Sequence, residues 1–273
     1  MMRPLLLGFL VTIGACASAP PATAPTPAAS VASAIHLRDD WRSTVIVERV
    51  DSIMLALPSG GHQLQRFHRT AGFTLSIGSS GVASIRLDSL RIDPAMADDA
   101  TSSVPIAAVW TGRVGDPAIN AFRPSSGNPS AAQLTAVVRG LLPRLPVAGA
   151  QPRSGWCDSA TGTTSSDMFA VTERRTATWS AGNVGGAAGS TTSVQLWEDF
   201  EQQGEGSNQG RTVTMTAQGR RTGTYYVGAD GRIISVKLAD SSAISIGIPQ
   251  THELMSGVRY SWTTARFLPA GTP

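Results

Sequence analysis

Most of the chain after residue 35 alternates between apolar and polar side chains with a period of two. The clearest case is 211–218, where Val213, Met215 and Ala217 fall on one face and three threonines on the other. Such alternation predicts a half-buried antiparallel strand. Similar runs in the first half of the chain predict strands over 42–57, 62–69, 72–78, 82–92 and 104–114.

The second half repeats the pattern between Gly-rich turns. Asp230-Gly231 predicts a hairpin turn, because this dipeptide supplies the positive φ that such turns need. Strands are predicted over 222–227, 233–238, 244–248 and 254–267. About ten or eleven strands at this spacing predict a mainly β fold, either a curved antiparallel sheet or an open half-barrel.

One segment departs from the period of two and has the spacing of an α-helix. Ser130 and Gln133 stand at capping-box spacing, and Pro143 blocks continuation. The sequence therefore predicts one amphipathic helix near 130–142, covering the concave side of the sheet as a lid or plug. Its apolar stripe consists of Leu134, Val137, Val138, Leu141 and Leu142.

The first 15 residues have the pattern of an export signal. Arg3 is followed by an apolar run and then by the small residues Gly14-Ala15. Nine apolar residues of helix rise roughly 14 Å, about half a bilayer core, which is too short to span a membrane. We therefore expect residues 1–15 to be a signal peptide.

The end of this segment, Ile13-Gly14-Ala15-Cys16, resembles the lipobox of bacterial lipoproteins. The resemblance implies cleavage before Cys16, acylation of this cysteine and anchoring in a lipid bilayer. Ala17 and Ser18 imply by the same resemblance an outer-membrane location facing the periplasm. The alternative is ordinary cleavage after Ala17, which would leave a soluble periplasmic protein.

The residues that follow predict a tether and then a single domain. Residues 16–35 are rich in Ala, Pro and Thr and carry no charge, so they cannot bury enough surface to fold. Residues 36–273 are expected to form one β-rich domain. The whole chain is 41% hydrophobic and 15% charged, with a net charge of +3. This balance excludes a disordered chain and gives no basic footprint for nucleic acid.

Two short motifs carry a further resemblance. Leu142 to Pro146 (LPRLP), followed by Gly155 to Asp158 (GWCD) and then by meandering strands, is similar to a group of uncharacterised β-rich bacterial lipoproteins. Their expected half-barrel is similar to that of the LolA and LolB lipoprotein carriers and of the mycobacterial lipid-binding lipoproteins. In that group a Thr stands where Cys157 is here, which argues against a catalytic role for this thiol.

Cysteine and histidine suggest no catalytic or metal site. Once Cys16 is lipidated, Cys157 has no intramolecular disulfide partner, and no histidine stands in a recognised arrangement with it. We expect Cys157 to be an inert, partly buried residue. His62 and His68 share one face of a strand but lie about 20 Å apart, too far to ligate one metal. The remaining histidines are His36 and His252.

Charged clusters are interpreted in the same way. We expect the acidic group Glu198, Asp199, Glu201 and Glu205 to be a solvated strand end, and Gly204 to Gly210 to be a flexible hairpin loop. The adjacent pairs Arg174-Arg175 and Arg220-Arg221 should split between the two faces of their strands and form no patch. The chain lacks G-x-S-x-G, H-E-x-x-H and Ser-x-x-Lys. We therefore expect a protein that is not an enzyme, with no catalytic residue, cofactor or metal.

Two functions remain open on the sequence. The first is an anchored envelope lipoprotein that binds an apolar ligand, such as acyl chains, in the half-barrel. The second is a structural or interaction lipoprotein with a dry core and no ligand, which meets another envelope protein. An elongated apolar cavity of several hundred Å³ would favour the first, and a filled interior the second.

Overall fold

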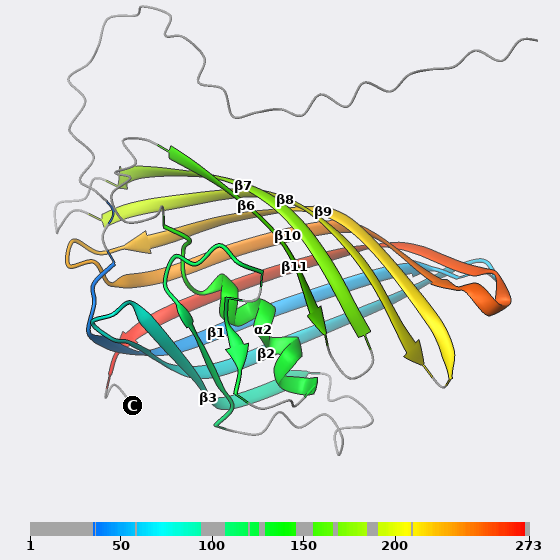
Figure 1. Ribbon diagram of the computed structural model, residues 1–273, viewed down its shortest axis with the longest axis horizontal. Helices are drawn as coiled ribbons and strands as arrows, with labels where there is room; N and C mark the ends of the chain where they lie inside the picture. Colours follow the sequence, from blue (N-terminus) through cyan, green and yellow to red (C-terminus); the bar gives the residue numbers. More distant parts are fainter. Residues whose placement is uncertain are drawn as a thin grey trace, which may run out of the picture. The chain divides into compact units, whose positions relative to one another are not determined.

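The computed structural model describes most of the predicted β-rich domain (Figure 1). The predicted signal peptide, Cys16, the tether up to residue 34 and His36 lie outside the described residues. The described residues are 35, 37–57, 59–93, 107–119, 121–125, 129–145, 155–165, 169–184, 191–208 and 210–270.

Eleven strands form a single antiparallel sheet that stays open rather than closing into a barrel. The predicted fold class, including the strand number, is confirmed. The strands are β1 (Trp41–Ala56), β2 (His62–Ile77), β3 (Val82–Asp93), β4 (Val109–Arg113), β5 (Arg123–Pro124), β6 (Gly155–Ser165), β7 (Phe169–Val184), β8 (Thr191–Asn208), β9 (Arg211–Val227), β10 (Ile233–Ile248) and β11 (Glu253–Pro269).

The strand order explains why a helix crosses the sheet. The order is β5-β4-β3-β2-β1-β11-β10-β9-β8-β7-β6, so the first and last strands of the chain pair at the centre. The edges are β5 and β6, which are consecutive in the chain, and their connection must pass from one edge to the other. Helix α2 (Pro129–Gly140) lies in this connection, and Figure 1 shows it against the curved sheet.

Several predicted strands are joined into longer ones. The runs 62–69 and 72–78 are one strand, β2, and β9 and β10 each continue through a stretch where the sequence predicted a break. The predicted loop at 204–210 is also shorter, because β8 continues to Asn208 and the turn is made with Gly210 at φ +77°. Strands of 16 to 18 residues span roughly 50 to 60 Å.

The core lies between α2 and the concave face of the sheet. Large aromatic and aliphatic side chains from both halves of the sheet meet there, each less than 2% exposed. They include Phe73, Leu75, Ile85, Trp110, Trp179, Leu196, Tyr225 and Ile233. Within the described part of the chain, no helix has the length and apolarity to cross a membrane.

Helix α2 ends at Gly140, two residues before the predicted end, and Leu141 and Leu142 lie in the turn that follows. Leu141 donates its backbone N–H to the Val138 carbonyl at 3.1 Å, which tightens this last turn. Both leucines nevertheless remain buried, at 1% and 3% exposure. The apolar stripe therefore extends past the helix itself.

Candidate functional site

The predicted apolar stripe of α2 is buried on the concave face. Leu134, Val137, Val138, Leu141 and Leu142 are each at most 6% exposed. This burial agrees with the helical spacing in the sequence. A role for the five residues in ligand binding stays a prediction.

Polar contacts hold the helix in place at several points. Trp110 Nε1 donates to Thr135 Oγ1 at 3.0 Å, and the Tyr225 hydroxyl donates to the Gly140 carbonyl at 3.2 Å. Arg139 donates to the Ile119 carbonyl. The helix is therefore joined to β4, to β9 and to the segment that precedes β5.

The space around the end of α2 is filled by side chains. The hollow beside Arg139, Leu142 and Arg175 measures only about 10 Å³. That is about the volume a single water molecule needs. Together with the burial of the α2 stripe, this small hollow indicates a packed core around the end of the helix among the described residues.

A row of charged and polar residues crosses the concave face at one level of the sheet, from β6 to β1. Consecutive members face each other by strand register, with Ala177 between the first two. Each member is buried or half-buried. We call this set the polar row: Asp158, Glu198, Arg221, Asp240, Ser261 and Asp51.

Glu198 is the centre of the polar row, and its side chain is fully buried. Arg144, from the segment after α2, donates to Glu198 Oε2 at 2.5 Å, and Arg221 donates to Oε1 at 2.7 Å. Arg175 Nε lies 3.9 Å from the same carboxylate. Three guanidinium groups thus surround one carboxylate and compensate its removal from water.

Arg144 connects this cluster to the edge of the sheet. Its Nε lies 3.1 Å from Asp158 Oδ2, and its guanidinium carbon stands 4.9 Å from the centre of the Trp179 ring. Trp179 Nε1 donates to Asp158 at 2.6 Å, while Trp156 Nε1 donates to the Arg144 carbonyl at 2.9 Å. The LPRLP and GWCD motifs of the sequence therefore meet in one network.

The electrostatics of the cluster keep its groups in one charge state. Burial raises the pKa of Glu198, but the charges of the surrounding arginines, first Arg221 and then Arg144, lower it by more. The net shift of the pKa is therefore downward. Burial, aided by Arg144, lowers the pKa of Arg175 to about 10, and burial raises the pKa of Tyr225 to about 12. Each of these shifts favours the protonation state that the group ordinarily has at neutral pH or leaves it in place. The cluster has the character of a structural network.

A second carboxylate, Asp51, completes the row on β1. Ser261 Oγ donates to it at 2.7 Å, Arg49 Nη2 lies 2.8 Å away, and Arg69 also donates to it. Burial raises the pKa of Asp51, but the hydrogen bond and charge of Arg49 outweigh this, so the pKa is lowered. The two central strands, β1 and β11, are thereby tied to each other and to β2.

The predicted solvated strand end is wrong for Glu198, and for Asp199 it is right only about exposure, because both residues lie in the middle of β8. Glu198 is 1% exposed at the centre of the polar row, whereas the Asp199 side chain is 69% exposed. Adjacent residues on a strand face opposite sides, so one carboxylate enters the interior and the next enters water. The arginine pairs split as predicted, since Arg175 and Arg221 take part in the network and Arg174 and Arg220 are exposed.

The residues weighed for catalysis and metal binding lie apart from this network. Cys157 is exposed on β6, not partly buried, and its Sγ lies 3.9 Å from Thr178 Oγ1 on β7. His62 and His68 are exposed on β2, and His252 follows β10. In the described ranges, no group of three or more His, Cys, Asp or Glu side chains has the arrangement of a metal site.

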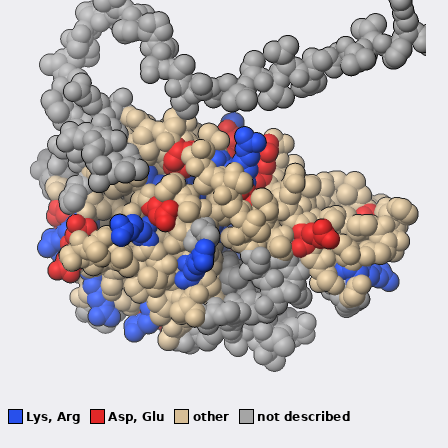
Figure 2. Space-filling view, in the orientation of Figure 1, with Lys and Arg blue, Asp and Glu red and all other residues tan. Residues whose placement is uncertain are grey.

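Charges of both signs are interspersed over the face shown in Figure 2. The face of strands β8 to β11 that points away from the core, which we call the outer face, carries the large hollows. They lie on the side to which Trp197 and Asp199 point, away from the buried Leu196 and Glu198. The sequence analysis did not identify this surface.

The first hollow measures about 420 Å³ and has a tryptophan on each side. Trp197 on β8 and Trp262 on β11 stand at the same level of the sheet, with Thr222 and Ala239 between them. Their side chains are 45% and 52% exposed. Three strand spacings separate the two backbone positions by roughly 14 Å. We call this hollow the aromatic groove.

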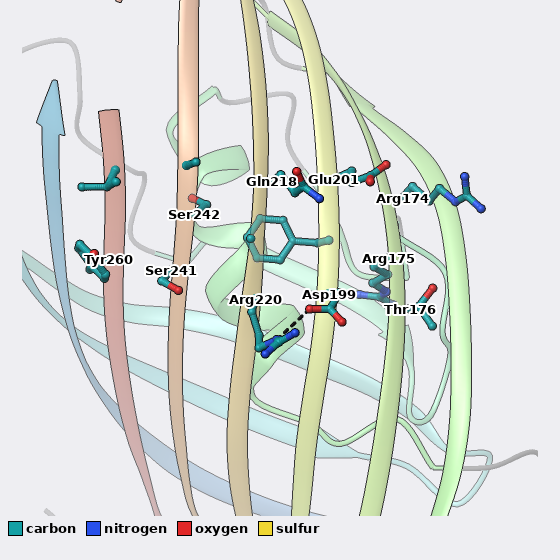
Figure 3. A pocket seen from close by; sticks show the side chains of 14 residues that line it. Arg174, Arg175, Thr176, Asp199, Glu201, Gln218, Arg220, Ser241, Ser242 and Tyr260 are labelled. Carbon is teal, nitrogen blue, oxygen red and sulfur yellow. Dashed lines mark hydrogen bonds and ion pairs between the residues drawn. The ribbon is translucent and has the colours of Figure 1, made fainter. Parts of the chain in front are cut away.

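The second hollow, of about 830 Å³, lies two residues further along the same strands. Its central level runs from Asp199 through Arg220 and Ser241 to Tyr260. Figure 3 shows the ion pair of Asp199 and Arg220, 2.8 Å apart. We call this hollow the charged groove. Because the two grooves occupy successive levels, together they form one outer trough.

Beneath the charged groove, Gly219 is required by close packing. A Cβ at this position would lie 2.2 Å from the Ser241 carbonyl oxygen and 2.8 Å from the Phe200 ring. The absence of a side chain lets the Phe200 ring approach β9, where Arg221 stands over it at 5.6 Å. The floor of the trough and the polar row are thus two sides of the same stretch of sheet.

Solved structures that resemble this chain include a LolA superfamily protein and an Acinetobacter protein. No family model and no curated protein matches the chain. A LolA superfamily protein from Nitrosomonas europaea is 8% identical, with a TM-score of 0.17 over 88% of this chain and 90% of that chain. OccAB4 of Acinetobacter baumannii is 8% identical, with a TM-score of 0.23 over 85% and 99%. Both scores are far below 0.5, and the half-barrel form is established by the strand order itself.

Proposed function

We propose that this chain is a non-enzymatic binding protein of the cell envelope that holds its ligand or partner on the outer face of the sheet. Acylated Cys16 would anchor it to the outer membrane, facing the periplasm, and residues 17–35 would serve as a tether. The lipobox spacing and the uncharged tether support this location.

The contrast between the two faces of the sheet carries the proposal. On the concave face, the hollow beside α2 measures about 10 Å³ and the apolar stripe of the helix is buried. On the outer face, the two grooves measure about 830 and 420 Å³. Ligand sites are concave surfaces of several hundred Å³. The filled interior favours the dry-core alternative of the sequence analysis over binding inside the half-barrel.

A second candidate function is carriage of an acyl chain on the concave face, where aliphatic and aromatic side chains line the core. The stripe of α2 occupies the apolar surface that an acyl chain would need, and the helix belongs to a connection between the two edges of the sheet. An acyl chain could bind there only by displacing α2. This would require breaking the contacts that Trp110, Tyr225 and Arg139 make with the helix and its surroundings.

The test compares the accessibility of the trough in membranes and in solution. Membranes from cells that make the full chain, and the same protein purified in detergent, are treated with a tryptophan oxidant. Oxidation of Trp197 and Trp262 is then measured by mass spectrometry of peptides. His252, exposed beyond the end of β10 and outside both grooves, is modified with diethyl pyrocarbonate as the internal control.

We expect Trp197 and Trp262 to be protected in membranes relative to the purified protein, with His252 modified equally in both. Equal oxidation of both tryptophans in the two samples would contradict binding at the outer trough. A noncovalent acyl lipid that co-purifies with the protein under these conditions would favour the second function instead.

A further inference from the structure

We propose that the outer trough binds an acidic oligosaccharide, a chain of pyranose rings that carries carboxylate groups. This inference rests on the proposed function, because it names the ligand class of the same surface. It depends on the side chains that line the aromatic groove and on their order along the sheet.

Exposed aromatic rings are the first observation. Trp197 and Trp262 line the aromatic groove from opposite sides, and Tyr260 stacks with Trp262 at a centroid distance of 6.2 Å and an interplanar angle of 16°. All three side chains are more than 40% exposed. Large aromatic rings on a soluble surface mark binding sites more often than scattered aliphatic residues do. A pyranose ring offers a face of C–H groups that can stack on such a ring.

The floor between the rings carries hydroxyl groups beside apolar surface, which favours a sugar over an acyl chain. Thr222 and Ala239 lie between the two tryptophans. Gln195, Thr224 and Thr264 lie on the next outward level of the same strands. An apolar chain lying there would take hydroxyl and amide groups out of water without giving them hydrogen bonds, which is unfavourable. A sugar has hydroxyl groups around its edge, and these can replace the water that the threonines and the amide lose.

Charge gives the ligand its acidic character. Lys237 is the lysine of a chain whose other basic residues are arginines, and it is the one charged residue that lines the aromatic groove. It lies one level from Trp197 and Trp262, opposite Thr224 on β9 and Thr264 on β11. The positive charge of Lys237 would attract an anionic group on a sugar ring held between the two tryptophans.

The charged groove extends the surface for further rings. Asp199 and Arg220 form an exposed ion pair, with side chains 69% and 65% exposed. Gln218 and Ser241 line the same groove (Figure 3). The levels from Gln195 to Glu201 span roughly 20 Å along β8, long enough for a ligand of several rings. The guanidinium, carboxylate, amide and hydroxyl groups of this groove supply hydrogen-bond donors and acceptors for the hydroxyl groups of neighbouring sugar rings.

The test uses isothermal titration calorimetry on the full chain purified in detergent. The probes are tetragalacturonate, which is acidic, and cellotetraose, which is neutral. We expect tetragalacturonate to bind more tightly than cellotetraose at low salt, and this preference to shrink as ionic strength rises. Lys237→Gln should remove most of the preference.

The tryptophans give the second readout. Trp197→Ala and Trp262→Ala should each weaken tetragalacturonate binding by roughly two- to tenfold, since a stacked ring contributes energy of that order. Trp197→Phe, which keeps a ring, should retain most of the affinity. Leu254→Ala changes an exposed apolar residue of β11 outside both grooves and should have no effect. Circular dichroism verifies that each variant is folded.

The outcomes separate this inference from the proposed function. If neither tetrasaccharide binds, or if Trp197→Ala and Trp262→Ala both leave the affinity unchanged, the oligosaccharide assignment is overturned. Equal affinities for the two probes at low salt would overturn the acidic class. If the trough is protected in membranes and the protection disappears with protease but not with polysaccharide-degrading enzymes, the partner is a protein. In that case the proposed function stands and this inference fails.

Discussion

Glu198→Gln tests whether the polar row holds the half-barrel together. The substitution keeps the size of the side chain and removes its charge from between Arg144 and Arg221, which now donate to it at 2.5 and 2.7 Å. Arg175, at 3.9 Å, loses the same counterion. The amide nitrogen of Gln would also face a guanidinium group, so that one hydrogen bond is replaced by two opposed donors.

Removing one partner from a buried ion pair typically costs about 3 to 5 kcal/mol, because the remaining charge stays buried without compensation. Gln retains one acceptor, and Asp158 remains beside Arg144 at 3.1 Å, so we expect a loss near the lower end, about 3 kcal/mol. This is a large fraction of a stability of about 5 to 15 kcal/mol. The urea midpoint should fall clearly.

Asp199→Asn is the matched control, because it makes the same chemical change one residue further along β8 on the opposite face. Asp199 pairs with Arg220 in water, and such exposed pairs contribute about 0 to 1 kcal/mol. The midpoint of this variant should stay near that of the wild type. A Glu198→Gln protein that is as stable as Asp199→Asn would refute a structural role for the polar row.

The pH dependence provides a second readout of the same charge. The pKa of Glu198 is lowered in the folded state, so its contribution is present above its ordinary carboxyl pKa and is lost as pH falls through the folded value. The wild type should therefore lose stability on acidification more steeply than Glu198→Gln. The gap between the two urea midpoints should narrow from pH 7 to pH 3. A gap that widens in acid would contradict this assignment.

Three further predictions concern the helix and the two cysteines. Leu141→Ala should lower the free energy of unfolding by about 2 to 5 kcal/mol in urea melts, because Leu141 is 1% exposed in a packed core. The variant should not bind a fluorescent fatty acid. Saturable binding of this probe with little loss of stability would instead indicate a movable lid. Cys157→Ser should change the free energy of unfolding in urea by less than about 0.5 kcal/mol and leave the cellular role intact, because the side chain is exposed. A folded variant that loses its cellular role would reverse this expectation. Cys16→Ser should abolish incorporation of labelled palmitate and cause release or faulty processing of the protein. If the wild-type protein takes up no label and is recovered from a soluble periplasmic fraction, Cys16 is not the anchor.

The sequence pattern predicts the architecture because local periodicity reports it directly. The alternation at Val213, Met215 and Ala217 identified β9, and the spacing of Leu134 to Leu142 identified α2. The predicted breaks in β9 and β10 are wrong for a single reason. Arg221 and Asp240 stand at inward positions where the apolar alternation stops, and in the fold they face each other within the polar row. Only the pairing of distant strands makes buried charges acceptable at mid-strand.

The candidate site depended even more on tertiary structure. Glu198 shares the alternation of the buried Val194, Leu196 and Phe200, whereas Asp199 falls on the other face, so this parity was the available signal for their opposite burial. The outer trough joins Trp197 and Trp262, which are 65 residues apart in the chain and become neighbours at one level through the register of three strand pairs. A tryptophan at an outward position of an otherwise polar strand face was the available signal, and its partner across the sheet could not be assigned without the topology.

The central claim is that the interior of the half-barrel is dry and that binding takes place outside it. Lipid extraction and mass spectrometry of the protein purified from its own envelope test this claim most directly. We predict acyl chains only in covalent linkage at the N-terminus, in the fraction that resists organic extraction. One extractable lipid per protein molecule, lost in a variant such as Leu141→Ala that disturbs the α2 stripe, would contradict the account.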